Sequence, residues 1–264
     1  MNLAGLSLAY LKDRALNTAL NVLLLTLSVA TLFSSQLTER FTRDAAGIDL
    51  VVGAKGSPLQ LILASIYQVD VPTGNIPGET VEQLRADPTV GEVIPLAQGD
   101  SFRGFRIIGT EPAYVEHYGG QVAQGRMFAA PFEAVIGAQA APQRSARLGQ
   151  QIIGSHRLSG DGHDHDQTPF ELVGVLAPTG AVLDRLIVTP AESVWAAHGI
   201  PLPGARDEHD HDHDEDHAAE AAHATHGGEP DVTALLVKYR STMAAVRLPR
   251  MINDQAGLQA AVPA

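Results

Sequence analysis

The sequence predicts a mixed α/β (α+β) extracytoplasmic domain preceded by one N-terminal transmembrane helix. Three observations support this fold class. One stretch near the N-terminus is long, apolar and uncharged, and the remainder alternates short apolar runs with helical patterns. The hydrophobic content of 45% is that of a globular protein rather than a disordered one. A chain of 264 residues has room for one sizeable domain or two small ones.

The apolar stretch at residues 15–38 carries no charge over 24 positions. At about 1.5 Å per residue, a helix of this length crosses a hydrocarbon core of roughly 30 Å. Residues 1–14 form a leader with apolar positions at helical spacing, which predicts a short amphipathic helix on the membrane surface. The alternative is a cleavable signal peptide with a cleavage site at Ser28-Val29-Ala30. Under either interpretation we expect the body of the chain to be extracytoplasmic.

The core domain is expected at residues 39–256, with a tail at 257–264. Its expected strands lie at residues 49–52, 90–95, 105–109, 133–137, 170–176, 185–188 and 234–239. Its expected helices lie at residues 57–67, 80–86, 112–118, 191–197 and 241–254. Two His/Asp-rich insertions, at residues 160–167 and 206–230, fall between these elements, where added length costs little.

The formal net charge of −12 is concentrated in those two insertions. They hold ten acidic residues, in 161–166 and 207–217, and without them the chain carries a formal charge of about −2. No basic stripe is present to neutralise phosphates, so a nucleic-acid partner is not expected. The chain has no cysteine, which excludes disulfides, thiol catalysis and thiolate metal sites.

The insertions have the composition of a divalent-metal site. From Asp207 to His217 every residue is His, Asp or Glu. Neutral imidazole is a good ligand for Zn²⁺, Ni²⁺ and Cu²⁺, and neighbouring carboxylates add oxygen ligands. The candidate ligands are His163, His165, His209, His211, His213, His217, His223 and His226. We expect multisite, exchangeable binding that weakens below about pH 6 as imidazoles protonate. The alternatives are a solvated acidic linker and a pH-sensing loop.

Several segments of the body resemble the permeases of MacB/FtsX-like ABC transporters. They are DLVVGAKGSPLQLILASIYQVDVPTGNI (49–76), RIIGTEPAYVEHYG (106–119), GRMF (125–128), EAVIGAQAA (133–141) and RLIVTPAESVWAAHG (185–199). The resemblance covers essentially the whole chain. It implies one transmembrane helix followed by a periplasmic core domain, in the inner membrane of a bacterium.

The resemblance also implies partners. Such permeases pair as homodimers or with a second permease subunit, work with a separate cytoplasmic ATPase, and contact periplasmic partners. Three further transmembrane helices would follow the core domain, so we expect a fragment of a longer permease or, less simply, a half-permease. The rival hypothesis is a membrane-anchored periplasmic metal-binding protein that acts without an ATPase.

The sequence contains no constellation typical of an enzyme. Gly53-Ala54-Lys55-Gly56-Ser57 lacks the spacing of a phosphate-binding loop and is expected to be a turn from a strand into a helix. His198 is expected at the end of a helix, where a cation complements the helix dipole. We therefore expect no catalytic residues and no intrinsic cofactor.

Overall fold

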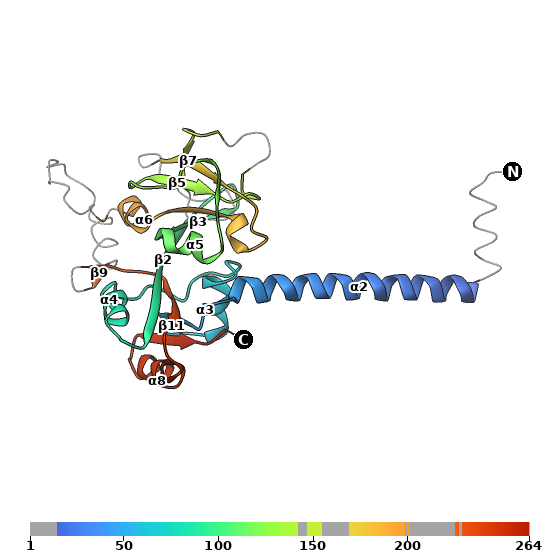
Figure 1. Cartoon of the computed structure of the whole chain (residues 1–264), viewed down its shortest axis with the longest axis horizontal. Coiled ribbons are helices and arrows are strands. Elements are labelled where there is room, and N and C mark those ends of the chain that lie inside the picture. The colour runs from blue at the N-terminus through green and yellow to red at the C-terminus, as the bar shows by residue number, and fades with distance from the viewer. Residues whose placement is uncertain are drawn as a thin grey trace. The chain divides into compact units, whose positions relative to one another are not determined.

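The computed structural model describes residues 15–141, 147–154, 169–198, 200, 225–226 and 229–263 (Figure 1). The chain forms two units, Met1–Arg43 and Asp44–Ala264. Seven of the eight predicted metal ligands and the predicted leader lie outside the described residues.

Helix α2 (Ala15–Ala45) contains the predicted transmembrane segment. Within the described part of the chain it is the one helix that is long and apolar enough to cross a membrane. The apolar stretch ends at Thr38, and the helix continues through four charged residues, Glu39, Arg40, Arg43 and Asp44, before it ends. Its last two residues, Asp44 and Ala45, belong to the second unit.

The second unit is built on one mixed β-sheet. Its strand order is β12 (Leu258–Ala261), β1 (Leu50–Ala54), β11 (Ala234–Tyr239), β2 (Val90–Phe102), β3 (Phe105–Thr110), β8 (Leu186–Pro190), β5 (Glu133–Ile136), β7 (Phe170–Leu176) and β4 (Val122–Gly125). Strand β6 (Gln151–Ile152) also pairs with β7. A separate hairpin joins β9 (Thr225–His226) to β10 (Glu229–Pro230).

Strand β2 divides this sheet into two lobes. Its first part pairs with β11, and its last part, from Ala97 to Phe102, pairs with β3. We call β12, β1, β11 and the start of β2 the first lobe, and the strands from β3 to β4 the second lobe. The first lobe is antiparallel throughout, whereas the second contains the parallel pairs β3–β8 and β5–β7. The register of β2 shifts between Gln98 and Ser101, at the passage from one lobe to the other.

Side chains alternate between the two faces of the sheet, as a period of two residues requires. Val51 lies in a core cluster that spans one face of both lobes, whereas Leu50 and Val52 lie in a cluster on the opposite face of the first lobe. Helix α3 (Pro58–Ser65) and helix α5 (Pro112–His117) cover the first face. Helix α4 (Glu79–Arg85) and helix α8 (Thr242–Asn253) cover the opposite face of the first lobe. Helix α6 (Ala191–Ala197) packs on β2, β3 and β8.

Local sequence explains where these helices begin. The Ser57 hydroxyl accepts a hydrogen bond from the N–H of Gln60, and Pro58 occupies the first turn, where its missing N–H costs nothing. Ser241 caps α8 in the same way, by accepting from the N–H of Met243. The segment from Gly53 to Ser57 therefore connects a strand to a helix, as predicted.

The predicted strands and helices of the body all occur, with altered ends. Strand β2 extends to Phe102, beyond its predicted end at Pro95. Strands β4 and β6, the hairpin β9–β10 and the 3-10 helix η1 (Val182–Arg185) were not predicted. The segment predicted as a tail, 257–264, contains β12, which pairs with β1 and forms part of the core domain.

Candidate functional site

The structure brings none of the predicted metal ligands together. His163, His165, His209, His211, His213, His217 and His223 lie outside the described residues, and His226 lies in β9, opposite Glu229. Among the residues that the structure describes, no group of three or more His, Cys, Asp or Glu side chains could hold a metal ion. The metal site therefore stays a prediction of the sequence.

The structure does describe two residues that precede the His/Asp-rich segments in the chain, Gly154 and His198. Gly154, the last described residue before the first segment, lies against the buried Asp100: a Cβ at this glycine would be 3.1 Å from Asp100 Oδ2. His198, two residues before Ile200 and the second segment, places its Nε2 3.9 Å from Asp100 Oδ1. Gly154 and His198 therefore both lie beside Asp100, in the last part of β2.

Helix α6 also contacts the chain directly after the second segment. His198 is the C-cap residue of α6, as predicted, and its N–H points to carbonyl groups in the last turn of the helix. On the far side of the segment, the Asp231 carbonyl accepts a hydrogen bond of 2.9 Å from Trp195 Nε1. Helix α6 therefore ends at His198, before the segment, and is bonded through Trp195 to Asp231, which follows it.

A second polar site is formed by the end of α2. Asp44 is only 5% exposed, although it closes a helix whose other described residues are mostly exposed. Its Oδ1 accepts a hydrogen bond of 2.7 Å from the N–H of Val182 in η1. Its backbone carbonyl accepts one of 3.1 Å from the Tyr118 hydroxyl, just after α5. The last turn of α2 is thereby bonded to two elements of the second lobe.

Three tyrosines, Tyr67, Tyr114 and Tyr118, lie near enough to Asp44 to feel its charge. The rings of Tyr114 and Tyr118 meet edge to face with 5.1 Å between their centroids. Burial raises the pKa of Tyr118 well above its ordinary value, and the nearby Tyr114 and Asp44 raise it further. Burial and Asp44 also raise the pKa of Tyr67. The raised pKa keeps the Tyr118 phenol neutral, so that its hydroxyl can donate to the Asp44 carbonyl.

The turn that presents Val182 is itself fixed by a buried carboxylate. Asp184 accepts hydrogen bonds from the N–H of Thr179 at 2.7 Å, from the Thr179 hydroxyl at 2.8 Å and from the N–H of Gly180 at 2.9 Å. Its carbonyl accepts from the N–H groups of Gln139 and Ala140. A carboxylate with several donors holds a loop in one conformation, so the donor for Asp44 is preorganised.

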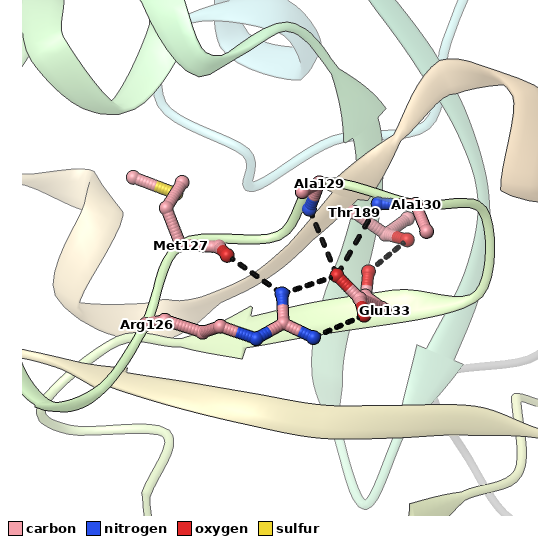
Figure 2. Close-up of polar contacts among 6 residues, drawn as sticks. All are labelled: Arg126, Met127, Ala129, Ala130, Glu133 and Thr189. Carbon is pink, nitrogen blue, oxygen red and sulfur yellow. Dashed lines mark hydrogen bonds and ion pairs between the residues drawn. The ribbon is translucent and has the colours of Figure 1, made fainter.

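An Arg–Glu pair in the second lobe joins the residue after β4 to the first residue of β5 (Figure 2). The Arg126 guanidinium binds the Glu133 carboxylate through both terminal nitrogens. Glu133 Oε2 also accepts from the N–H groups of Ala129, at 2.8 Å, and Ala130, at 3.2 Å. The Arg126 hydrogen bond, followed by these backbone donors, lowers the pKa of Glu133 from 4.5 to about 2. This arrangement closes the loop between β4 and β5.

Comparison with known protein families shows the family of this chain. The family model described as the MacB-like periplasmic core domain matches residues 18–246. The chain belongs to this family. Its members form the periplasmic domains of permeases of ABC transporters, which agrees with the resemblance seen in the sequence.

A solved structure shares the fold of this MacB-like domain. The periplasmic region of MacB from Actinobacillus actinomycetemcomitans aligns with a TM-score of 0.50 and 14% identity, over 84% of this chain and 94% of that one. The extracellular domain of the ABC-type transporter YknZ from Gram-positive bacteria aligns with a TM-score of 0.46 and 15% identity, over 81% and 98%. A search of curated proteins gave no match.

Within the MacB-like domain, two of the segments that resemble the family contact each other. GRMF supplies Arg126 and Gly125, and EAVIG supplies Glu133, so the two motifs meet in the Arg–Glu pair. The burial of Asp44 and of Asp100 was not predicted from the sequence. No local signal distinguishes Asp44 from the other charged residues that follow the apolar stretch, because its burial depends on Val182, 138 residues away.

Proposed function

We propose that this chain is the membrane-anchored periplasmic part of a permease subunit of a MacB-type ABC transporter in the bacterial inner membrane. Helix α2 would cross the membrane and the second unit would lie in the periplasm. The observation that carries the proposal is the position of Asp44. Because Asp44 is hydrogen-bonded to Val182 and Tyr118, a movement of the end of α2 would be passed to η1 and to the residue after α5.

The work of this domain would be mechanical. A separate cytoplasmic ATPase would supply the motion, and the permease would act as a homodimer or with a second permease subunit. The periplasmic domain would change its contact with a periplasmic partner. The family to which the chain belongs supports this coupling, since its members are parts of ABC permeases.

Purification from native membranes tests the proposal. The tagged full chain, extracted in mild detergent, should retain a nucleotide-binding subunit in a fixed ratio. Asp44→Ala should leave that association intact and reduce the change in periplasmic partner binding that ATP produces. A chain that purifies from membranes with its metal but without any ATPase would support the rival, an anchored metal-binding protein.

The side of the membrane can be tested separately, because the chain has no cysteine of its own. A single cysteine at the exposed Asp254 should react with an impermeant maleimide added to intact spheroplasts. Labelling only after lysis would place the domain in the cytoplasm and contradict the proposal.

We further propose that the two His/Asp-rich segments bind divalent metal, Zn²⁺ most readily, so that the transporter takes part in metal handling. The supporting observation is the alternation of His and Asp in HDHDH, which gives imidazole and carboxylate ligands at every position.

A further inference from the structure

The imidazole of His117, the last residue of α5, lies against the turn that joins α2 to β1. We call residues 46–49 the α2–β1 turn. A Cβ on Gly47 would lie 3.3 Å from His117 Cε1, so the ring reaches the main chain of the turn only because this position is a glycine. The ring also meets the ring of Tyr118 edge to face, with 4.7 Å between the centroids. His117 therefore packs against both the α2–β1 turn and Tyr118.

The surroundings of His117 suit a neutral imidazole. Its Nε2 is buried, and no described group forms a hydrogen bond with it. The charged groups that act on the ring are Lys238 of β11, which opposes a second positive charge, and Glu92 of β2, which favours one. Glu92 is already paired with Lys238 at 2.5 Å. Burial, followed by Lys238, lowers the pKa of His117 below its ordinary 6.5.

The carboxylates next to the α2–β1 turn are also engaged elsewhere. Asp44 accepts a hydrogen bond from the N–H of Val182, and Asp49 Oδ2 accepts one of 2.7 Å from the N–H of Tyr239. Tyr118 donates its hydroxyl to the Asp44 carbonyl and stays neutral, so it offers no negative charge. An imidazolium at this place would have to compete with these bonds for an acceptor, which makes a buried charge costly.

We propose that His117 is an acid-sensitive switch, whose protonation drives the ring away from Gly47 and loosens the α2–β1 turn. Departure of the ring would also remove the support of Tyr118, which holds the Asp44 carbonyl. All these contacts lie within the second unit, so the switch does not depend on where α2 is placed.

The direction of the pH effect follows from the neutral form being the one that favours folding. The stabilising contribution of His117 is complete above pH 6.5, the ordinary pKa of histidine, because the ring is then neutral in the folded and in the unfolded chain. The contribution is lost as the pH falls below 6.5 through the lowered pKa of the folded state. Acid should therefore open the α2–β1 turn, and neutral pH should close it.

Hydrogen exchange of the full chain in detergent, read by mass spectrometry over residues 44–49, tests the switch. Exchange rates are corrected for their intrinsic dependence on pH. In the native protein, protection of this segment should fall several-fold from pH 7.5 to pH 5.0, because local opening becomes easier. His117→Phe keeps an aromatic ring beside Tyr118 but cannot be protonated, so its protection should be the same at both pH values. His198→Gln, at another histidine of the described fold, is the control and should behave as the native protein.

Three outcomes would overturn the inference. They are a native segment with equal protection at pH 7.5 and 5.0, an equal acid loss in His117→Phe, and an acid loss that disappears in His198→Gln. His117→Gln repeats the comparison with a smaller uncharged side chain, in case phenylalanine does not fit beside Gly47. Loss of the pH dependence in His117→Gln, with the native response kept in His198→Gln, would support the switch.

Discussion

The carboxylate of Asp44 accepts a hydrogen bond from the backbone N–H of Val182, and the two residues are 138 positions apart in the chain. Both are buried. The contact joins the last turn of a helix that leaves the domain to the 3-10 helix η1 in its second lobe. Since the rest of α2 belongs to another unit, this bond is where the helix becomes part of the domain.

Replacement of Asp44 by alanine should destabilise the domain. The N–H of Val182 would stay buried without its acceptor, which costs on the order of 1–3 kcal/mol. Asp44→Asn keeps an oxygen acceptor and should cost less. The measurement is urea unfolding of the full chain in detergent, followed by the fluorescence of Trp195. Asp254→Ala, at an exposed aspartate, is the control. An equal loss of stability in this control would show that the hydrogen bond from Val182 to Asp44 does not stabilise the domain.

The pair of Arg126 and Glu133 should make stability depend on pH in the acid range. The pKa of Glu133 is about 2 in the folded protein, against an ordinary 4.5. A lowered pKa means that the ionised form favours folding, so this contribution is complete above pH 4.5 and is lost as the pH falls toward 2. Glu133→Gln lacks it at every pH.

Denaturant unfolding of both proteins at several pH values checks this prediction. The difference in unfolding free energy between the native protein and Glu133→Gln should be constant above about pH 5 and shrink below it. A difference that stays constant down to pH 2.5 would show that the carboxylate is not stabilised by its partners.

Two glycines with left-handed backbones should respond differently to alanine. Gly125 has φ +75°, and a Cβ there would meet the Val173 carbonyl oxygen at 2.1 Å; Gly104 has φ +85° with open space around it. Both substitutions should cost roughly 1–2 kcal/mol for the left-handed conformation. Gly125→Ala should cost a further 1–3 kcal/mol or so because the main chain of β7 must move. Thermal unfolding of the two variants compares them, and equal losses would contradict the close approach.

Zinc uptake by the full chain should depend on the histidines of the two segments. Replacing the six from His209 to His226 by asparagine should remove most of the bound zinc, and replacing His163 and His165 a smaller share. Binding should weaken below about pH 6, because protonated imidazole is not a ligand. Metal analysis after equilibrium dialysis measures the effect, with His117→Asn as the control outside the segments. Unchanged uptake in the six-residue variant would favour a solvated acidic linker.

The strands and helices that could be predicted from the sequence are those with strong local signals. The continuous apolar run ALLV in β11 and the Ser-Pro start of α3 indicate these elements without reference to the rest of the fold. Strand β12, with the sequence LQAA, has weak strand propensity and is extended because it pairs with β1. The end of β2 contains Gly99 and Asp100, which are poor strand formers, and its extension depends on β3.

The functional features also fall into two groups, those visible in the local sequence and those formed by distant segments. The family resemblance was visible in short motifs, and the comparison with the MacB-like periplasmic core domain confirmed it. The burial of Asp44 and the approach of His198 to Asp100 arise from segments far apart in the chain, so no pattern of neighbouring residues predicts them. The histidine segments show the opposite case, in which composition predicts a chemistry that the described residues do not test.

Strand β2 gives the domain an unusual mechanical property. Two lobes joined by a loop can swing freely, whereas these two share one strand whose hydrogen bonds to β11 and β3 follow one another along its length. The strand can bend with least loss of pairing between Gln98 and Ser101, where the register already shifts. A bend between the two lobes would therefore be concentrated at this point of β2, with the pairing on either side of it kept.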